Sequence, residues 1–104
     1  MIIVLGGVSI KEGRLVEALQ ISRAHVARSR LEPGCIEHGV HQDAENPGRL
    51  VFVERWESMA SLQTHFAVPE SGAAVRALAA MATEPPRIAL YNAEKLAFPG
   101  TSAA

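Results

Sequence analysis

The spacing of apolar residues divides the first half of the chain into four regular segments. Ile2–Ile10 is apolar at nearly every position and rich in β-branched residues, which is typical of a strand covered on both faces. Arg14–Arg30 places its apolar residues at helical spacing and ends before Pro33. Cys35–Gln42 and Leu50–Glu57 predict two strands, joined as a hairpin by a loop rich in turn-forming residues.

The second half of the chain predicts two helical pieces and a last strand. Ser58 is a favourable N-cap for a short helix that continues to Ala67. Pro69 begins a second, alanine-rich helix, and a Pro-Pro pair that starts at Pro85 ends it. Ile88–Leu96 then predicts the fourth strand.

This order of elements indicates the fold class. Strand, helix, strand, strand, helix, strand is the ferredoxin-like βαββαβ arrangement, an α+β fold with a four-stranded antiparallel sheet and helices on one face. A chain of 104 residues suits a single domain. We interpret residues 1–97 as that domain and residues 98–104 as a flexible C-terminal tail.

The third strand is apolar on both of its faces. Alternation puts Leu50, Phe52 and Trp56 on one face and Val51 and Val53 on the other. Helices on one side of the sheet leave the second face open to water, where a large apolar patch is rare in a monomer. We therefore expect a homodimer in which two sheets pack face to face and form an α/β barrel.

Composition and charge exclude several classes of protein. Ten basic residues oppose eleven acidic ones, so there is no basic excess to indicate a nucleic-acid partner or an anionic membrane. Neither a secretory signal nor an apolar run of about 20 residues is present, so we expect no membrane association. The single cysteine, Cys35, excludes an internal disulfide framework and a multi-cysteine zinc site, which favours a cytoplasmic setting.

Three short stretches of the sequence form a combined pattern. They are residues 32–36 (Glu-Pro-Gly-Cys-Ile), residues 46–58 with Glu54 and Trp56 two positions apart, and Leu62 followed by His65, nine residues after the tryptophan. In this order and at these spacings they resemble the antibiotic biosynthesis monooxygenase family of the dimeric α/β-barrel superfamily, and the resemblance extends over about residues 2–96. It implies one small-molecule pocket in each subunit, between the helices and the sheet.

The same resemblance implies the leading function and leaves two alternatives. The family includes oxygenases that act on phenolic or quinol compounds without metal or flavin, so we expect a cofactor-independent monooxygenase with a small aromatic substrate and no cofactor. One alternative is an isomerase or cyclase of the same fold, with His38, His41 and Glu70 as polar pocket groups. The other is a dimer that binds a small molecule without turnover.

His65 is the candidate catalytic residue. It lies at the edge of the inner stripe of the short helix, beside Leu62 and Phe66. Histidine changes its charge between pH 5 and 8, which suits a general base. In a cofactor-free oxygenase the base removes a phenolic proton, and the electron-rich anion then reacts with dioxygen. The alternative is a structural hydrogen bond at the edge of the helix.

Six further residues are candidate substrate contacts. His38 and His41 lie three apart on a strand, so they point to opposite faces and cannot hold one metal ion together. We expect no metal site from this pair. Because Tyr91 has small alanine neighbours two positions away on either side, there is room beside its ring. The candidate substrate-binding residues are His38, His41, Trp56, Phe66, Arg76 and Tyr91.

Two more polar side chains receive structural interpretations. A carboxylate between Phe52 and Trp56 is costly to bury unless it is paired, so we expect Glu54 to form an ion pair with Arg55 or Arg49 of another strand or subunit. Strict alternation places Cys35 on the same strand face as Glu37 and His41. An acidic neighbour raises a thiol pKa, so we interpret this cysteine as a small buried side chain.

Overall fold

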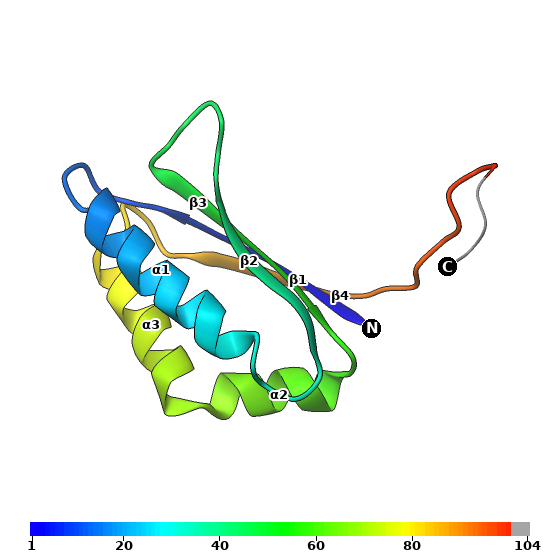
Figure 1. Ribbon diagram of the computed structural model, residues 1–104. Helices are drawn as coiled ribbons and strands as arrows, with labels where there is room; N and C mark the ends of the chain where they lie inside the picture. Colours follow the sequence, from blue (N-terminus) through cyan, green and yellow to red (C-terminus); the bar gives the residue numbers. More distant parts are fainter. Residues whose placement is uncertain (101–104) are drawn as a thin grey trace.

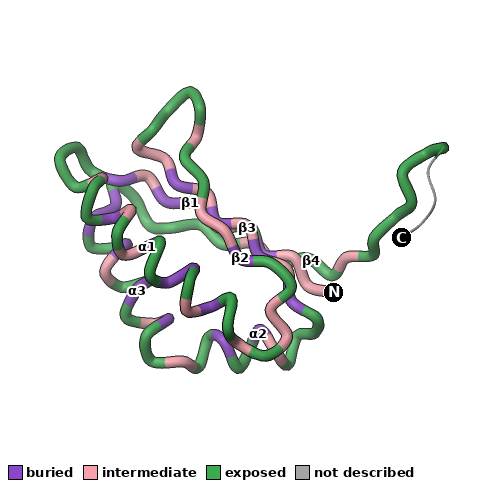
Figure 2. Tube along the Cα trace, viewed as in Figure 1, coloured by how far each residue is buried: buried purple, intermediate pink, exposed green. Residues whose placement is uncertain are grey.

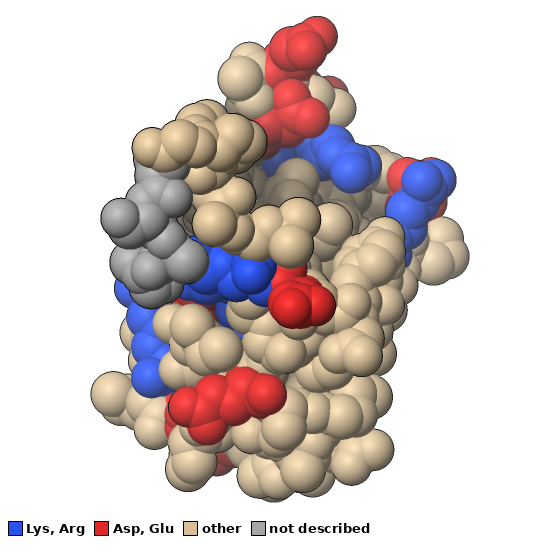
Figure 3. Space-filling view, turned by 90° about the vertical axis from the view of Figure 1, so that its right-hand side faces the viewer, with Lys and Arg blue, Asp and Glu red and all other residues tan. Residues whose placement is uncertain are grey.

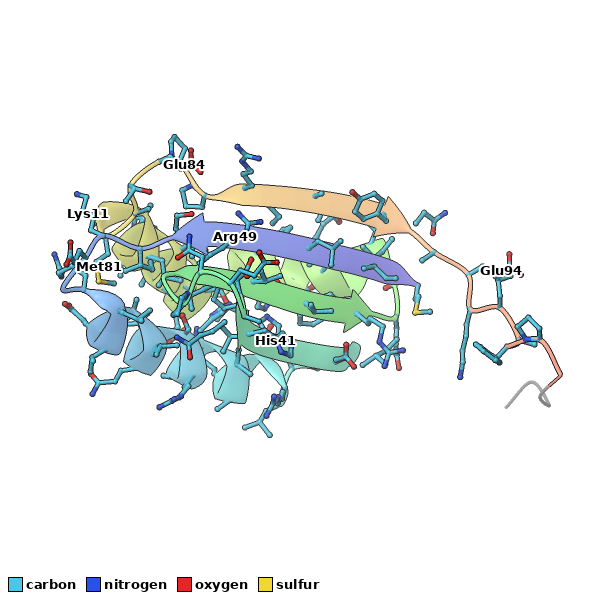
Figure 4. The ribbon with its side chains drawn as sticks, turned by 90° about the horizontal axis from the view of Figure 1, so that it is seen from above. Lys11, His41, Arg49, Met81, Glu84 and Glu94 are labelled. Carbon is cyan, nitrogen blue, oxygen red and sulfur yellow. The ribbon has the colours of Figure 1, made fainter. Side chains whose placement is uncertain are left out.

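The computed structural model describes residues 1–100 and confirms the ferredoxin-like order of elements. All strand pairs are antiparallel, and the four strands lie in the order β2-β3-β1-β4, as they appear side by side in Figure 4. The helices cover one face of this sheet (Figure 1). The elements are β1 (Ile2–Ser9), α1 (Leu15–Ser29), β2 (Cys35–Gln42), β3 (Arg49–Trp56), α2 (Met59–Ala67), α3 (Pro69–Ala80) and β4 (Arg87–Asn92).

The helix boundaries follow from local chemistry. The side-chain oxygen of Ser58 accepts a hydrogen bond from the backbone N–H of Ser61 at 3.2 Å, so it is the N-cap of α2 as expected. Pro69 occupies the first turn of α3, where its missing N–H has no helical partner to lose. Val68 is extended between the two helices, and this break turns α3 back along the sheet beside α1 (Figure 1).

The last strand is shorter than the sequence predicts. β4 ends at Asn92, not at Leu96, because its ladder with β1 ends at the pair of Ile2 and Asn92. The backbone N–H of Ala93 still donates to the carbonyl of Met1 at 2.9 Å, and the chain then leads away from the sheet (Figure 1). Residues 101–104 of the expected tail lie outside the described residues.

The core between sheet and helices is divided by a row of polar side chains. A larger apolar cluster includes Val8, Leu50 and Phe52 from the sheet, together with side chains of α1 and α3. A smaller cluster holds Val4, Trp56 and Leu62. The inner-face row of His38 and Glu54 lies between the Phe52 and Trp56 positions. Figure 2 shows the buried positions along the sheet and the inner sides of the helices.

The outer face of the sheet is apolar but only partly covered. Leu5 is 43% exposed and Tyr91 is 52% exposed, and Ile3, Val51 and Val53 share their face. Acidic and basic side chains are interspersed on the side of the molecule seen in Figure 3. Within residues 1–100, none of the helices has the length and hydropathy that a membrane crossing requires.

Candidate functional site

Four buried polar side chains from four different elements meet beneath the sheet. They are His25 of α1, His38 of β2, Glu54 of β3 and His65 of α2, with exposed fractions of 6%, 1%, 7% and 2%. The three imidazole rings lie 5.1 to 5.5 Å apart between centroids. Buried polar groups are expensive unless they are paired, so a cluster of this kind marks the candidate site.

A tight turn places a carboxylate against His65. Gly34 has φ +83°, and a Cβ at this position would overlap the Ser61 side chain, so only glycine fits. The turn brings Glu32 Oε1 to 2.9 Å from His65 Nδ1. A carboxylate only accepts, so Nδ1 carries a proton, and in the neutral imidazole Nε2 therefore has the lone pair. That Nε2 atom lies 3.8 Å from Glu54 Oε1.

Glu54 is held by an indole N–H and by nearby imidazoles rather than by arginine. Its Oε1 accepts a hydrogen bond from the indole N–H of Trp56 at 2.9 Å and lies 3.3 Å from His38 Nε2. Burial alone would raise the pKa of Glu54, but the nearby His38, the indole N–H and His65 outweigh it and lower that pKa below its usual value. The carboxylate is therefore ionised at neutral pH. The expected pairing with arginine is wrong, because Arg55 contacts Glu37 on the outer face instead.

His25 is a neutral histidine with a fixed tautomer. Arg28 Nη2 lies 2.7 Å from His25 Nδ1, and because a guanidinium only donates, Nδ1 accepts and the proton lies on Nε2. Burial lowers the pKa of His25 to about 4, with further lowering by His38, His65 and Arg28 and partial opposition from Glu54. The contacts thus place a proton on Nε2 of His25 and on Nδ1 of His65.

The lowered pKa of His25 predicts a loss of stability in mild acid. Between pH 6.5 and about 4 the unfolded chain binds a proton at His25 that the folded chain does not bind, so the free energy of unfolding falls as the pH falls. The slope from this group is at most about 1.4 kcal/mol per pH unit. Urea unfolding at pH 7 and pH 5 should show a smaller pH effect for His25→Gln than for the wild type. Equal pH effects would contradict the assignment.

An apolar cavity of about 270 Å³ lies beside the cluster, between β1, β4 and α3. Gly6 has no side chain at its inner-face position, which leaves space next to Phe52. Ala74 and Leu78 of α3 form the opposite wall. Two polar side chains of the cluster, His25 and Glu54, reach the lining of the cavity. The lining residues are Gly6, Gly7, Val8, His25, Phe52, Glu54, Ala74, Val75, Leu78, Ala79, Pro86, Arg87 and Ile88.

The structure brings together three of the residues that the sequence singles out. His65 and His38 are in the cluster, and the Trp56 ring stacks on His65 with centroids 4.6 Å apart. Phe66 is half-exposed, with its ring centroid 5.8 Å from that of His65. Neither these four residues nor the other three candidates are among the residues that line the cavity.

The other three candidates lie away from the cluster. His41 is exposed on β2, where Figure 4 labels it, on the face opposite to His38. Arg76 is exposed on α3. Tyr91 lies on the outer face of the sheet, opposite Ile3.

A β-bulge corrects the expected position of Cys35. The register of β2 shifts between Cys35 and Glu37, so Cys35 lies opposite Trp56 on the inner face and not on the face of His41. Burial raises the pKa of the Cys35 thiol, and Glu54 and Glu32 raise it further. The thiol is thus a poor nucleophile, as expected from the sequence. The acidic neighbours that raise its pKa are Glu54 and Glu32, however, and not Glu37.

Sequence reasoning missed two residues of the site. His25 lies in a line of buried polar residues on α1, with Ser22 three positions before it and Ser29 four positions after it. Polar residues at helical spacing within a buried stripe are the signal that identifies this line. Glu32 belongs to a stretch that the sequence singles out, but its contact with His65 joins positions 33 residues apart. No local pattern reveals that contact.

Comparison with known proteins gives one family and a consistent fold. The model of the family described as antibiotic biosynthesis monooxygenase matches residues 1–77. An uncharacterized protein from Synechocystis is 29% identical over 91 residues, which is 88% of this chain and 62% of that protein. The chain therefore spans less than two thirds of the length of this curated relative.

Solved structures agree over almost the whole chain. A candidate antibiotic biosynthesis monooxygenase from Deinococcus radiodurans has a TM-score of 0.88 and 26% identity, with 94% of this chain and 97% of that chain covered. A conserved protein from Methanosarcina mazei has a TM-score of 0.85 and 25% identity, with coverage of 89% and 92%.

Proposed function

The chain belongs to the antibiotic biosynthesis monooxygenase family, and from this membership we propose that it is a cofactor-independent monooxygenase of phenol- or quinol-like compounds that bind in the cavity beside the histidine cluster. Family membership supports a monooxygenase-like or small-molecule-binding function.

One observation carries the proposal. A mainly apolar cavity has the ionised carboxylate of Glu54 in its lining, and this carboxylate lies 3.8 Å from Nε2 of His65, which has a lone pair in the neutral imidazole. An aromatic ring fits the apolar walls, and its hydroxyl group donates a hydrogen bond to Glu54. His65 accepts the proton, while Glu32 holds its ring and stabilises the imidazolium. In this proposal His65 acts as the base through Glu54, the carboxylate that contacts the substrate.

The reaction needs no external reductant, because the substrate supplies the electrons. Proton removal gives a phenolate, which transfers an electron to dioxygen. One oxygen atom enters the ring as a quinone oxygen, and the other leaves as water with the two hydrogens that the substrate loses. The apolar walls protect the radical pair from water. They also disfavour the alternative of an isomerase or cyclase for a hydrophilic substrate.

Oxygen consumption by metal-free protein tests this function. A panel of naphthols and hydroquinones would be followed with an oxygen electrode and by mass spectrometry of the quinone formed under ¹⁸O₂. We expect turnover above autoxidation, with one labelled oxygen atom in the product. Saturable binding with no turnover across the panel would instead support the small-molecule-binding alternative.

Filling the cavity is expected to weaken ligand binding without unfolding the protein. Ala74 faces the cavity, whereas its neighbour Ala73 is exposed on the same helix. Leucine and alanine have similar helix propensities, so Ala74→Leu adds three carbon atoms to the cavity at little cost to α3. We expect at least about a tenfold loss of affinity for a naphthol, which is ~1.4 kcal/mol. Calorimetric titration of Ala74→Leu and Ala73→Leu measures the difference, and equal affinities would place the ligand elsewhere.

We also propose that the protein is a homodimer formed through the outer face of the sheet. The half-exposed side chains of Leu5 and Tyr91 belong to an apolar face that a second sheet would cover. Light scattering at micromolar concentration should report about twice the chain mass of 11.1 kDa. Leu5→Glu should shift this mass towards the monomer, because it buries a charge against the partner sheet. A monomeric wild type would contradict the proposal.

A further inference from the structure

The three buried histidines converge in a way that a proton relay does not require. Their rings come from α1, β2 and α2, so three separate elements bring them together. Each imidazole offers one ring nitrogen, and these three nitrogens all lie within 4.8 Å of one another. Tetrahedral zinc, with Zn–N bonds of 2.0–2.1 Å, needs nitrogens about 3.3 Å apart. To bind such an ion, the three nitrogens would have to move closer together.

His38 supplies an independent observation. Its side chain is fully buried, and neither ring nitrogen has a hydrogen-bond partner. Its Nε2 lies 3.3 Å from Glu54 Oε1, which is an ion-pair distance without hydrogen-bond geometry. A buried polar group without a partner typically costs ~1–3 kcal/mol. A cation at the centre of the cluster would give this imidazole the partner that it lacks.

The groups around the rings also suit a cation. Histidine ligands usually donate their second ring N–H to a carboxylate or a carbonyl, and His65 does so to Glu32 at 2.9 Å. Its Nε2 remains free as a donor atom for a metal. The Glu54 carboxylate adds an oxygen ligand 3.3 Å and 3.8 Å from the nitrogens of His38 and His65.

We propose that His38, His65 and Glu54, with His25 as a fourth ligand, form a binding site for a divalent transition-metal ion of the zinc class. Three imidazoles and one carboxylate are the donor set that favours zinc, cobalt, iron and copper over magnesium or calcium. This site differs from a His38–His41 pair, which the strand geometry excludes.

Arg28 determines how strongly His25 takes part. Its guanidinium donates to His25 Nδ1 and thereby keeps the proton of the imidazole ring on Nε2. For His25 to bind the ion through Nε2, Arg28 has to release Nδ1, and its positive charge also opposes a cation nearby. Arg28→Gln removes that charge and offers an amide oxygen that accepts from Nδ1–H. We therefore expect this variant to bind the ion more tightly than the wild type.

The metal site shares His65 and Glu54 with the proposed oxygenase reaction, but its test does not depend on that reaction. An ion on His65 Nε2 occupies the lone pair that the proposed reaction uses, so metal binding and proton acceptance exclude each other. Added zinc is therefore expected to inhibit turnover of a phenol or quinol. Metal binding is measured without any substrate, so its failure and the failure of the oxygenase proposal are distinguishable.

Titration with Zn²⁺ and Co²⁺ tests the site on untagged protein that has been treated with a chelator. A polyhistidine tag must be absent because it binds the same ions. We expect one ion per chain by calorimetry, and for Co²⁺ the visible absorption of a low-coordinate nitrogen site. His38→Ala should raise the dissociation constant at least about 100-fold. Loss of a residue that only hydrogen-bonds to a metal ligand already lowers metal affinity 10–100-fold. His38→Gln repeats the test with a polar side chain, and circular dichroism verifies that both variants fold.

His41→Ala is the matched control, because this fourth histidine lies on the same strand as His38 but on the opposite, exposed face. It should leave the affinity unchanged, while Arg28→Gln should raise it several-fold. Three results would overturn the proposal: no binding at millimolar ion, equal binding by wild type and folded His38→Gln, or loss of binding in His41→Ala. A lower affinity in Arg28→Gln would exclude His25 as a ligand.

Discussion

Replacing His65 with glutamine is expected to lower the turnover of a phenol or quinol by about 100- to 10,000-fold, the usual range for loss of a general base. Glutamine keeps a polar side chain of similar reach beside Glu32 but accepts no proton at neutral pH. Substrate affinity should change little, because the ring of His65 is not among the residues that line the cavity. Steady-state oxygen consumption and calorimetric binding of the same naphthol separate the two effects.

His41→Gln is the control for that prediction. It makes the same change at an exposed histidine on the opposite face of the sheet and should leave turnover as it is. The turnover of Glu32→Gln should lie between those of His65→Gln and His41→Gln. This change leaves the His65 ring in place but removes the charge that stabilises the imidazolium. Turnover that survives His65→Gln unchanged would exclude this histidine as the proton acceptor. Loss of affinity alone would instead indicate a binding role.

Much of the fold follows from local patterns. The alternation of Leu50, Phe52 and Trp56 determines which face of β3 is buried, and a period of two is visible without knowledge of any partner. Ser58 and Pro69 start their helices through interactions that extend over only a few residues. The sequence-based predictions are wrong where contact with a distant segment determines the local structure. β4 ends at Asn92 because of its pairing with β1, and Cys35 changes face because of a bulge against β3.

The site is less predictable because four elements build it. His25 and His38 are 13 residues apart in the sequence and belong to a helix and a strand, so no periodicity connects them. The partners of Glu54 are equally difficult to predict from the sequence. A carboxylate between large apolar residues signals that some partner exists, but the nearest arginines point to the outer face. Only the packing of α1 and α2 on the sheet shows that the partners are an indole and two imidazoles.

Trp56→Ala is expected to be the most destabilising of the single substitutions considered. The side chain is fully buried between Val4 and Leu62, and truncation of a buried aromatic residue costs ~3–5 kcal/mol. The change also removes the indole N–H from Glu54, which leaves a buried carboxylate with one donor fewer. A domain of this size is stable by only ~5–15 kcal/mol, so the variant should be close to unfolding at 37 °C.

Two further variants separate packing from hydrogen bonding at this position. Trp56→Phe keeps an aromatic ring on His65 but loses the donor, so it should cost ~1–3 kcal/mol. Leu96→Ala, at an exposed position after β4, should change the free energy of unfolding by less than ~0.5 kcal/mol. Urea unfolding at one fixed protein concentration compares all three, since the stability of the proposed dimer would depend on concentration. If Trp56→Ala unfolds at the same urea concentration as Leu96→Ala, the smaller apolar cluster does not hold β3 to α2, and the placement of His65 against Glu54 loses its support.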